Sequence, residues 1–82
     1  MNNEKMEEFF ERVRAERRRH VALGWTAEHD RYHDSRWWAA MLAKQVGDLA
    51  RWCIFDDGND EEVETALVQI TAVAVAFFEA RR

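Results

Sequence analysis

Residues 60–81 read DEEVETALVQITAVAVAFFEAR, and this stretch decides the fold. Its apolar side chains cover much of the circumference of a helix and are Val63, Leu67, Val68, Ile70, Val73, Val75, Phe77 and Phe78. The β-branched residues among them would also suit a strand, but the stretch is too long for a strand and lacks turn signals. A helix that is apolar on several sides is buried on several sides. In so short a chain we expect one of those sides to meet another subunit.

The segments before this helix also predict helices. Residues 56–60, DDGND, form a turn signal that supplies an N-cap to the last helix. Upstream, residues 35–55 predict a second helix that is capped by Ser35 and has an apolar stripe of Trp38, Met41, Leu42, Leu49 and Cys53. A first helix is expected from an N-cap at Asn3 to a stop near Gly24. The predicted fold class is all-α, with three main helices in a bundle that oligomerisation completes.

The connection between the first two helices is polar and aromatic. Residues 24–34 read GWTAEHDRYHD, with room for a short extra helix, and loops that carry such residues often have functional roles. His29 and His33 stand four residues apart, which on a helix would suit Zn²⁺, but no third ligand follows at a suitable spacing. A solvated loop is therefore the favoured interpretation. Just upstream, His20 and the arginines at 17–19 suit the negative end of a helix dipole, and a phosphate-binding patch is the alternative for the arginines.

The bulk composition limits the classes of function. Eighty-two residues make a single domain, 1–82, whose core is marginal for its size. A net charge of −4 offers no overall attraction to nucleic acid or to an anionic membrane, so neither is an expected partner. The apolar stretch 66–78 is short for a bilayer span, and the start lacks the pattern of a signal peptide. The single cysteine, Cys53, is expected to be a buried, inert thiol in a cytoplasmic protein.

Two stretches carry a resemblance to a known family. Residues 42–50, LAKQVGDLA, and residues 66–77, ALVQITAVAVAF, resemble the paired helices of MazG-like proteins in the all-α NTP pyrophosphatase superfamily. Residues 24–30, GWTAEHD, are also similar to the opening of some phage and bacterial relatives. Family members carry an EExxE motif on one helix and an ExxD motif on the next. The resemblance implies Mg²⁺ ions held by these acids and cleavage of a nucleoside triphosphate to the monophosphate and pyrophosphate.

This chain departs from the family pattern at most of the acidic positions. Lys44, Gln45 and Asp48 stand at the first motif, and Ala66 and Gln69 stand at the second, so only Asp48 keeps a carboxylate. Lys44 brings a positive charge to the place where the resemblance implies a metal ion. If a metal site is rebuilt, the candidate ligands are Asp48, Gln69 and Glu62. The candidate nucleotide contacts are Lys44 and Trp25, whose ring could stack on a base.

Three functions remain open from the sequence. The favoured hypothesis is a MazG-like family member with impaired or lost hydrolysis, which acts as a nucleotide-binding or interaction module and needs no cofactor. The alternative is an active NTP pyrophosphohydrolase that uses Mg²⁺ in a rebuilt site. A second alternative is a helical protein-interaction adaptor from a phage or a mobile element. In each case we expect a homodimer or a homotetramer.

Overall fold

The described part of the chain forms three long helices and one short helix. The computed structural model describes residues 3–55 and 59–81. In order, the helices are α1 (Asn3–Ala22), α2 (Ala27–Asp30), α3 (Ser35–Ile54) and α4 (Asp60–Ala80). No strand occurs among the described residues. The predicted all-α class is confirmed, and the short helix that the connection had room for is α2.

Side-chain caps set where three of these helices begin. Asn59 caps α4, because its side-chain oxygen accepts a hydrogen bond of 2.8 Å from the Glu62 N–H. Thr26 caps α2 in the same way. The cap of α3 is Asp34, whose Oδ1 accepts from the Trp37 N–H at 3.0 Å, so the prediction of Ser35 was wrong by one residue. Residues 56–58 of the predicted turn lie outside the described residues.

Gly24 ends α1. Its φ of +98° is the left-handed conformation that glycine adopts without strain. The Gly24 N–H donates to the Val21 carbonyl at 3.0 Å, and the Trp25 N–H donates to the His20 carbonyl at 2.9 Å. This pair of bonds is the Schellman motif, which satisfies the last carbonyl groups of a helix. The predicted stop near Gly24 is confirmed.

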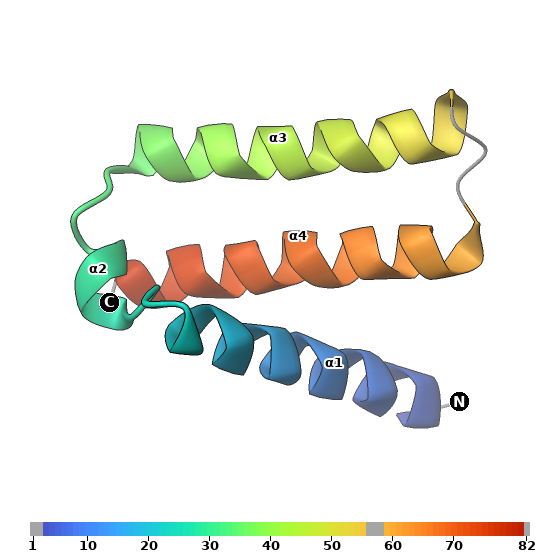
Figure 1. Cartoon of the computed structure of the whole chain (residues 1–82). Coiled ribbons are helices and arrows are strands. Elements are labelled where there is room, and N and C mark those ends of the chain that lie inside the picture. Colours follow the sequence, from blue (N-terminus) through green and yellow to red (C-terminus); the bar gives the residue numbers. More distant parts are fainter. Residues whose placement is uncertain (1–2, 56–58, 82) are drawn as a thin grey trace.

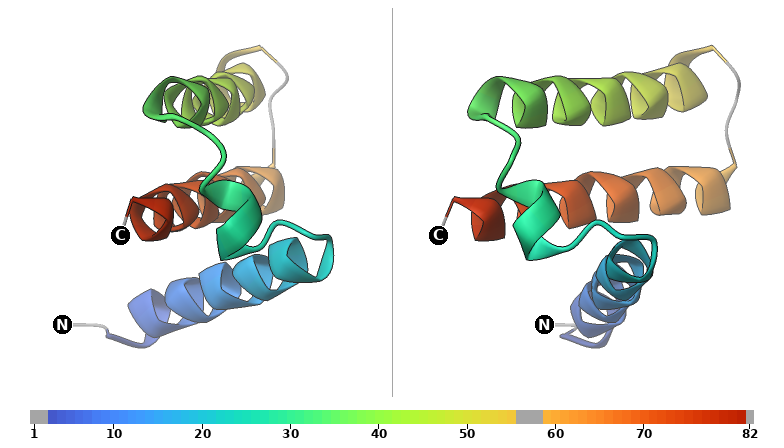
Figure 2. Two further views of the ribbon diagram at one scale, coloured as in Figure 1. Left: turned by 90° about the vertical axis from the view of Figure 1, so that its left-hand side faces the viewer. Right: turned by 60° about the vertical axis from the view of Figure 1, so that its left-hand side comes forward.

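The long helices form a layer with α4 in the middle (Figure 1). α3 packs along one side of α4 and α1 packs along the other, and in the described part of the chain no Cα of α1 comes within 8 Å of α3. Figure 2 shows α2 lying across α4 at the end where α1 stops and α3 begins. Arg81 closes the same end, since its guanidinium donates to Ser35 Oγ at 2.9 Å.

The core consists of two small clusters on opposite sides of α4. One joins α1 to α4 through Val13, Val68 and Ala72, and the other joins α3 to α4 through Trp38, Val73 and Ala76. The Trp38 ring stacks on Phe77 with centroids 5.5 Å apart. In the predicted stripe of α3, Met41 and Leu42 pack half-buried against the second cluster, and Leu49 is half-buried as well. Cys53 is exposed, so the prediction of a buried thiol was wrong.

By length and composition alone, α4 is apolar enough to cross a membrane, in contrast to what its short uninterrupted apolar stretch indicated. Such a helix is also typical of the centre of a helical layer, where two neighbours pack against it. In this chain α1 and α3 occupy those two sides.

Candidate functional site

The three predicted metal ligands line one cavity. Asp48 from α3 and Glu62 and Gln69 from α4 surround a hollow of about 320 Å³ between the two helices. Glu62 and Gln69 are seven residues apart, which is about two turns, so they lie on the same side of α4, and α3 runs antiparallel beside it (Figure 1). The remaining lining residues are Gln45, Trp52, Asn59, Glu61, Thr65 and Ala66. The prediction that these ligands share a site is consistent with this placement.

The Asp48 carboxylate is paired with two cations of its own helix. The Lys44 ammonium lies 3.3 Å from one carboxylate oxygen, and the Arg51 guanidinium lies 3.9 Å from the other. These partners stand four residues before and three residues after Asp48, so helical spacing places all three on one face. Lys44 therefore lies close enough to Asp48 for its charge to take the place of that of a metal ion, which is the role proposed for it from the sequence.

The Gln69 side chain is hydrogen-bonded to α1 and not to α3. Its Nε2 donates a hydrogen bond to Glu16 Oε2 of α1. Glu16 has only 10% of its side chain exposed and also accepts from Arg19, whose guanidinium holds the pKa of this carboxyl below its ordinary value. Sequence reasoning missed Glu16, although its spacing of four residues from His20 placed both on one face of α1.

A second hollow adjoins the first. It has a volume of about 300 Å³, lies between α1 and α4, and shares Thr65 and Gln69 with the first. The α1 wall of this hollow carries Arg12, Glu16 and Arg19. The two hollows together form a groove that runs between α1 and α3 over one edge of α4, and we call it the polar groove.

As arranged, the donor set of the polar groove is poorly matched to Mg²⁺. This ion requires near-octahedral oxygen ligands, and proteins usually provide it with carboxylates. Here one of the two candidate carboxylates is paired with two cations, and the amide of Gln69 is donating to Glu16. Across residues 3–55 and 59–81, no three His, Cys, Asp or Glu side chains lie close enough together to hold a metal ion.

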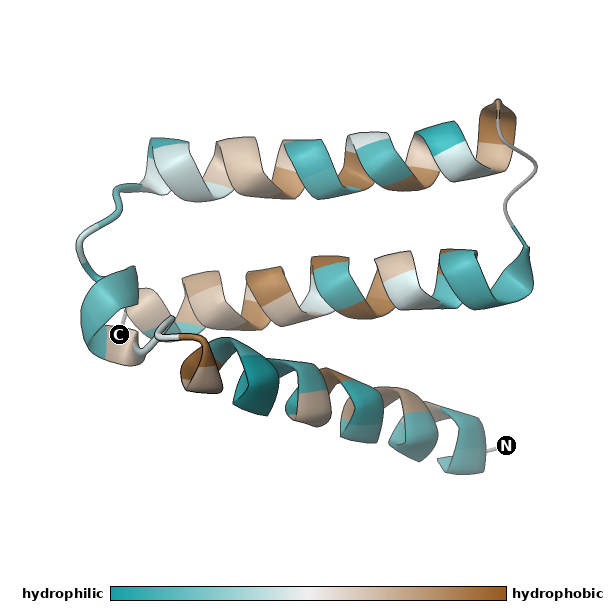
Figure 3. Cartoon of the chain, in the orientation of Figure 1, coloured by the Kyte–Doolittle hydropathy of each residue, from teal (hydrophilic) through white to brown (hydrophobic). Residues whose placement is uncertain are grey.

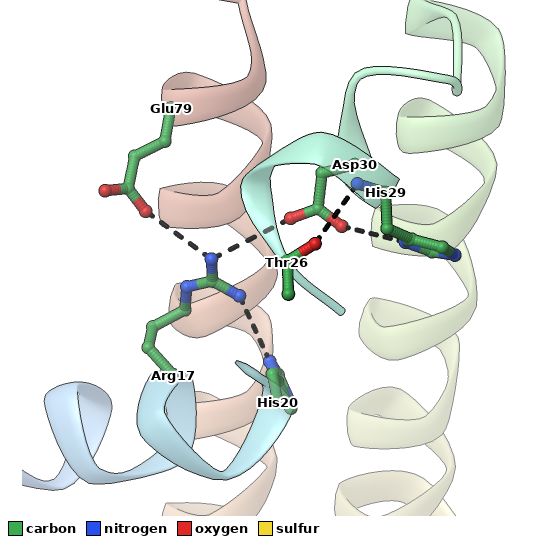
Figure 4. A network of polar contacts seen from close by, with 6 residues as sticks. All are labelled: Arg17, His20, Thr26, His29, Asp30 and Glu79. Carbon is green, nitrogen blue, oxygen red and sulfur yellow. Dashed lines mark hydrogen bonds and ion pairs between the residues drawn. The ribbon is translucent and has the colours of Figure 1, made fainter. Parts of the chain in front are cut away.

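A buried ionic network holds α2 in place. Figure 4 shows Arg17 of α1 reaching between α2 and α4. Its Nη2 lies 3.8 Å from Asp30 Oδ2 and 3.5 Å from Glu79 Oε1, and its Nη1 lies 3.5 Å from His20 Nδ1. On the other side of Asp30, its Oδ1 is 3.2 Å from His29 Nδ1. Asp30 is 4% exposed, which differs from the predicted solvated loop at this residue, whereas the other residues of the connection are exposed except the half-buried His33.

His20 is buried as well. The residue is only 2% exposed, and burial lowers the pKa of its imidazole. It does lie in the last turn of α1, as a dipole partner would, but its ring also faces Glu16, Arg17 and Trp25 of this chain. The sequence contained no signal that would separate a buried histidine from an exposed one at this position.

Trp25 lies at the α2 end of the molecule, away from the groove residues. Its ring packs on His20 with centroids 5.0 Å apart, and 41% of the residue is exposed. It lines a separate, narrow cavity of about 20 Å³ together with Trp37 and Trp38. The structure therefore does not bring together Trp25 and Lys44, the two predicted nucleotide contacts. The aromatic residue that lines the polar groove is Trp52.

The histidine pair of the connection takes part in aromatic packing. The rings of His29 and His33 meet edge to face at 5.1 Å, and His33 stacks on Trp37 at 3.7 Å. The sequence raised a zinc pair at these residues as a minor alternative. The observed ring contacts instead connect α2 to the start of α3.

Comparison of the chain with protein-family models, with curated proteins and with solved structures gives no match. The MazG-like resemblance therefore remains a hypothesis that rests on the residues 42–50 and 66–77 quoted above.

Proposed function

We propose that this chain is a MazG-like helical module that binds a nucleotide in the polar groove and has lost most or all Mg²⁺-dependent hydrolysis. The observation that carries the proposal is that Asp48, which lines the cavity, is paired with Lys44 and Arg51, two exposed cations that lie beside the cavity. In this proposal the two cations supply the positive charge that Mg²⁺ supplies in an active relative. A triphosphate could then bind without a metal ion.

The lining of the polar groove supports a nucleotide as the ligand. Each hollow is close to the lower limit of about 300 Å³ for small-molecule sites, and the shared edge makes the combined site larger. Trp52 offers an aromatic face on which a base could stack, and the amides of Gln45 and Asn59 can donate and accept hydrogen bonds. Arg12 and Arg19 on the α1 wall now pair with Glu64 and Glu16, and in this proposal they would turn to the phosphate oxygens.

Loss of hydrolysis follows from what the chemistry requires. Attack of water on phosphorus needs a metal ion to position the water and to neutralise the charge that develops on the phosphate oxygens. Lysine and arginine can bind the triphosphate, but they do not lower the pKa of a bound water as a metal ion does. The proposed module therefore retains binding and loses the nucleophile.

One observation favours the alternative of an active pyrophosphohydrolase. Asp48 and Glu62 face the same cavity from different helices, which is the way a shared metal ion would bridge them. A Mg²⁺ ion would then have to displace Lys44 and Arg51 from Asp48.

Calorimetry with a panel of nucleoside triphosphates, with and without Mg²⁺, tests the proposal. We expect binding that persists without Mg²⁺ and little release of pyrophosphate. Trp52→Leu should weaken binding by about tenfold, because loss of base stacking costs about 1–3 kcal/mol. Trp25→Leu is the matched control and should leave affinity unchanged.

Each other outcome has a distinct meaning. Pyrophosphate release that Asp48→Asn abolishes would establish the active enzyme instead. Loss of binding in Trp25→Leu but not in Trp52→Leu would move the base site to the α2 end. An absence of binding to any nucleotide would refute the nucleotide proposal.

A further inference from the structure

A hollow at the α2 end of the molecule combines charged and apolar walls, and we call it the α2 hollow. Its volume is about 430 Å³, which lies within the range of about 300–1,000 Å³ that is usual for small-molecule sites. Its lining includes Arg17 and Val21 of α1, Ala27 and Asp30 of α2, and Glu79 and Ala80 of α4. In the described part of the chain, none of these residues also lines the polar groove.

The charged wall of the α2 hollow is the pair of Arg17 and Glu79, which Figure 4 shows joining α1 to α4. The Arg17 Nη2 atom lies 3.5 Å from Glu79 Oε1 and 3.8 Å from Asp30 Oδ2. Both distances exceed the length of a close charge-assisted hydrogen bond, which is about 2.7–2.9 Å. The Arg17 side chain is only 16% exposed, and the buried Asp30 holds it at the wall. Arg17 can therefore still form a close, bidentate bond to a carboxylate that enters the hollow.

The spacing of this pair suits a ligand that carries both charges. An ammonium and a carboxylate joined through a single carbon are about 3 Å apart, close to the 3.5 Å between Arg17 and Glu79. Such a ligand can lie across the pair, and Glu79 is accessible to it because 59% of that side chain is exposed. An anion alone would also face the carboxylates of Glu79 and Asp30. A cation alone would face Arg17 and Arg18, which lines the hollow as well.

The rest of the α2 hollow is apolar. Val21, Ala27 and Ala80 line it, and Val21 is 49% exposed. Figure 3 shows a hydrophobic segment at the end of α1, next to α2. An aliphatic group placed here would remove apolar surface from water, which is favourable in proportion to the area covered.

We infer that the α2 hollow binds a free α-amino acid with an aliphatic side chain. Arg17 binds the carboxylate of the ligand, and Glu79 binds its ammonium group. The aliphatic side chain packs on Val21, Ala27 and Ala80. The inference does not depend on the nucleotide proposal, because the α2 hollow and the polar groove have separate walls.

Calorimetry of the full chain with L-leucine and its derivatives tests the inference. Leucine should bind, and leucine amide and N-acetylleucine should each bind at least about tenfold more weakly, because each lacks one of the two charges. Leucyl-leucine should also bind more weakly, since its two charges are further apart. Glycine has both charges but no side chain, and it should bind several-fold more weakly than leucine. An added nucleoside triphosphate should not compete with leucine.

Two glutamates of α4 provide a matched pair of variants. Glu79→Gln should weaken leucine binding by about tenfold, because the ammonium group loses its carboxylate. Glu64→Gln is the control and should leave the affinity unchanged, since Glu64 is 62% exposed and pairs with Arg12 of α1 at 3.2 Å but does not line the α2 hollow. Circular dichroism checks that each variant is folded. If Glu79→Gln is not, Ala27→Phe replaces it, because Ala27 is exposed and the larger side chain fills the hollow.

Several results would overturn the inference. One is the absence of any heat of binding with leucine. Another is equal affinity for leucine and N-acetylleucine, or equal effects of Glu79→Gln and Glu64→Gln. Tighter binding of leucyl-leucine than of leucine would assign the α2 hollow to a peptide instead.

Discussion

Replacing Arg17 with methionine tests whether the buried network of α2 stabilises the fold. Methionine keeps most of the apolar stem and removes the charge. The Arg17 and Asp30 side chains are 16% and 5% exposed, so the change leaves a buried carboxylate without its guanidinium. Breaking a buried ion pair in this way costs about 3–5 kcal/mol.

Two contacts seen in the structure make the expected loss of stability smaller than this range. Asp30 keeps His29 at 3.2 Å, and the lost contact to the exposed Glu79 is worth at most about 0.5 kcal/mol. We therefore expect Arg17→Met to lower the free energy of unfolding by about 2–3 kcal/mol. A chain of this length has about 4–12 kcal/mol in total, so the loss is a large fraction of its stability.

Urea unfolding followed by circular dichroism measures the change. For a small domain, about 2–3 kcal/mol corresponds to a fall of roughly 1–2 M in the midpoint. Arg14→Met is the matched control, because Arg14 is 57% exposed and pairs only with its neighbour Glu11 at 3.3 Å among the contacts seen. It should cost less than about 0.5 kcal/mol. All variants are compared at one chain concentration, because self-association adds to apparent stability.

A double-mutant cycle separates the ion pair from loss of packing. In an Asp30→Asn background, Arg17→Met should cost about 1–2 kcal/mol less than it does in the wild type, since no buried charge is left unpaired. The reasoning would be refuted if Arg17→Met cost no more than Arg14→Met, or if its cost were the same in both backgrounds.

Two further predictions follow from His20 and from the two described glycines. Because burial holds the pKa of His20 below its ordinary value of about 6.5, the unfolded chain binds the proton first, and stability should fall as the pH drops from about 7.5 to 5. Melting temperatures recorded against pH should fall less steeply in this window for His20→Gln, and an unchanged slope would contradict the assignment. Gly24→Ala should destabilise the chain by about 1 kcal/mol because Gly24 has a φ of +98°, whereas Gly47→Ala within α3 should stabilise it by about 0.5–1 kcal/mol. Equal effects of the two alanines on the urea midpoint would contradict the role of backbone conformation.

The helices and most of their ends could be read from the sequence because they depend on nearby residues. The periodicity of residues 60–81, the glycine at 24 and the asparagine at 59 act within one or two turns of a helix. The cap of α3 was predicted at Ser35 in place of Asp34, two adjacent residues that both suit the role. Local chemistry allows either residue, and the backbone conformation of the connection selects one.

The sequence alone also placed Asp48, Glu62 and Gln69 on two helices that were expected to pair, and all three line one cavity. What Gln69 and Asp48 do there could be inferred only in part. The Lys44 partner of Asp48 is on the same helix and follows from spacing. The Glu16 partner of Gln69 is 53 residues away, and only the packing of α1 against α4 brings it near.

Only the tertiary structure decided which polar groups are buried. Asp30 and His20 are enclosed, while Cys53 is exposed, in each case against what local chemistry indicated. A charged side chain is rarely buried without a partner, and Arg17 of α1 is the partner that another element supplies to Asp30. The sequence therefore determined the helices and the faces that they could bury. The packing of α1, α2 and α3 on α4 determined which of those faces one chain does bury.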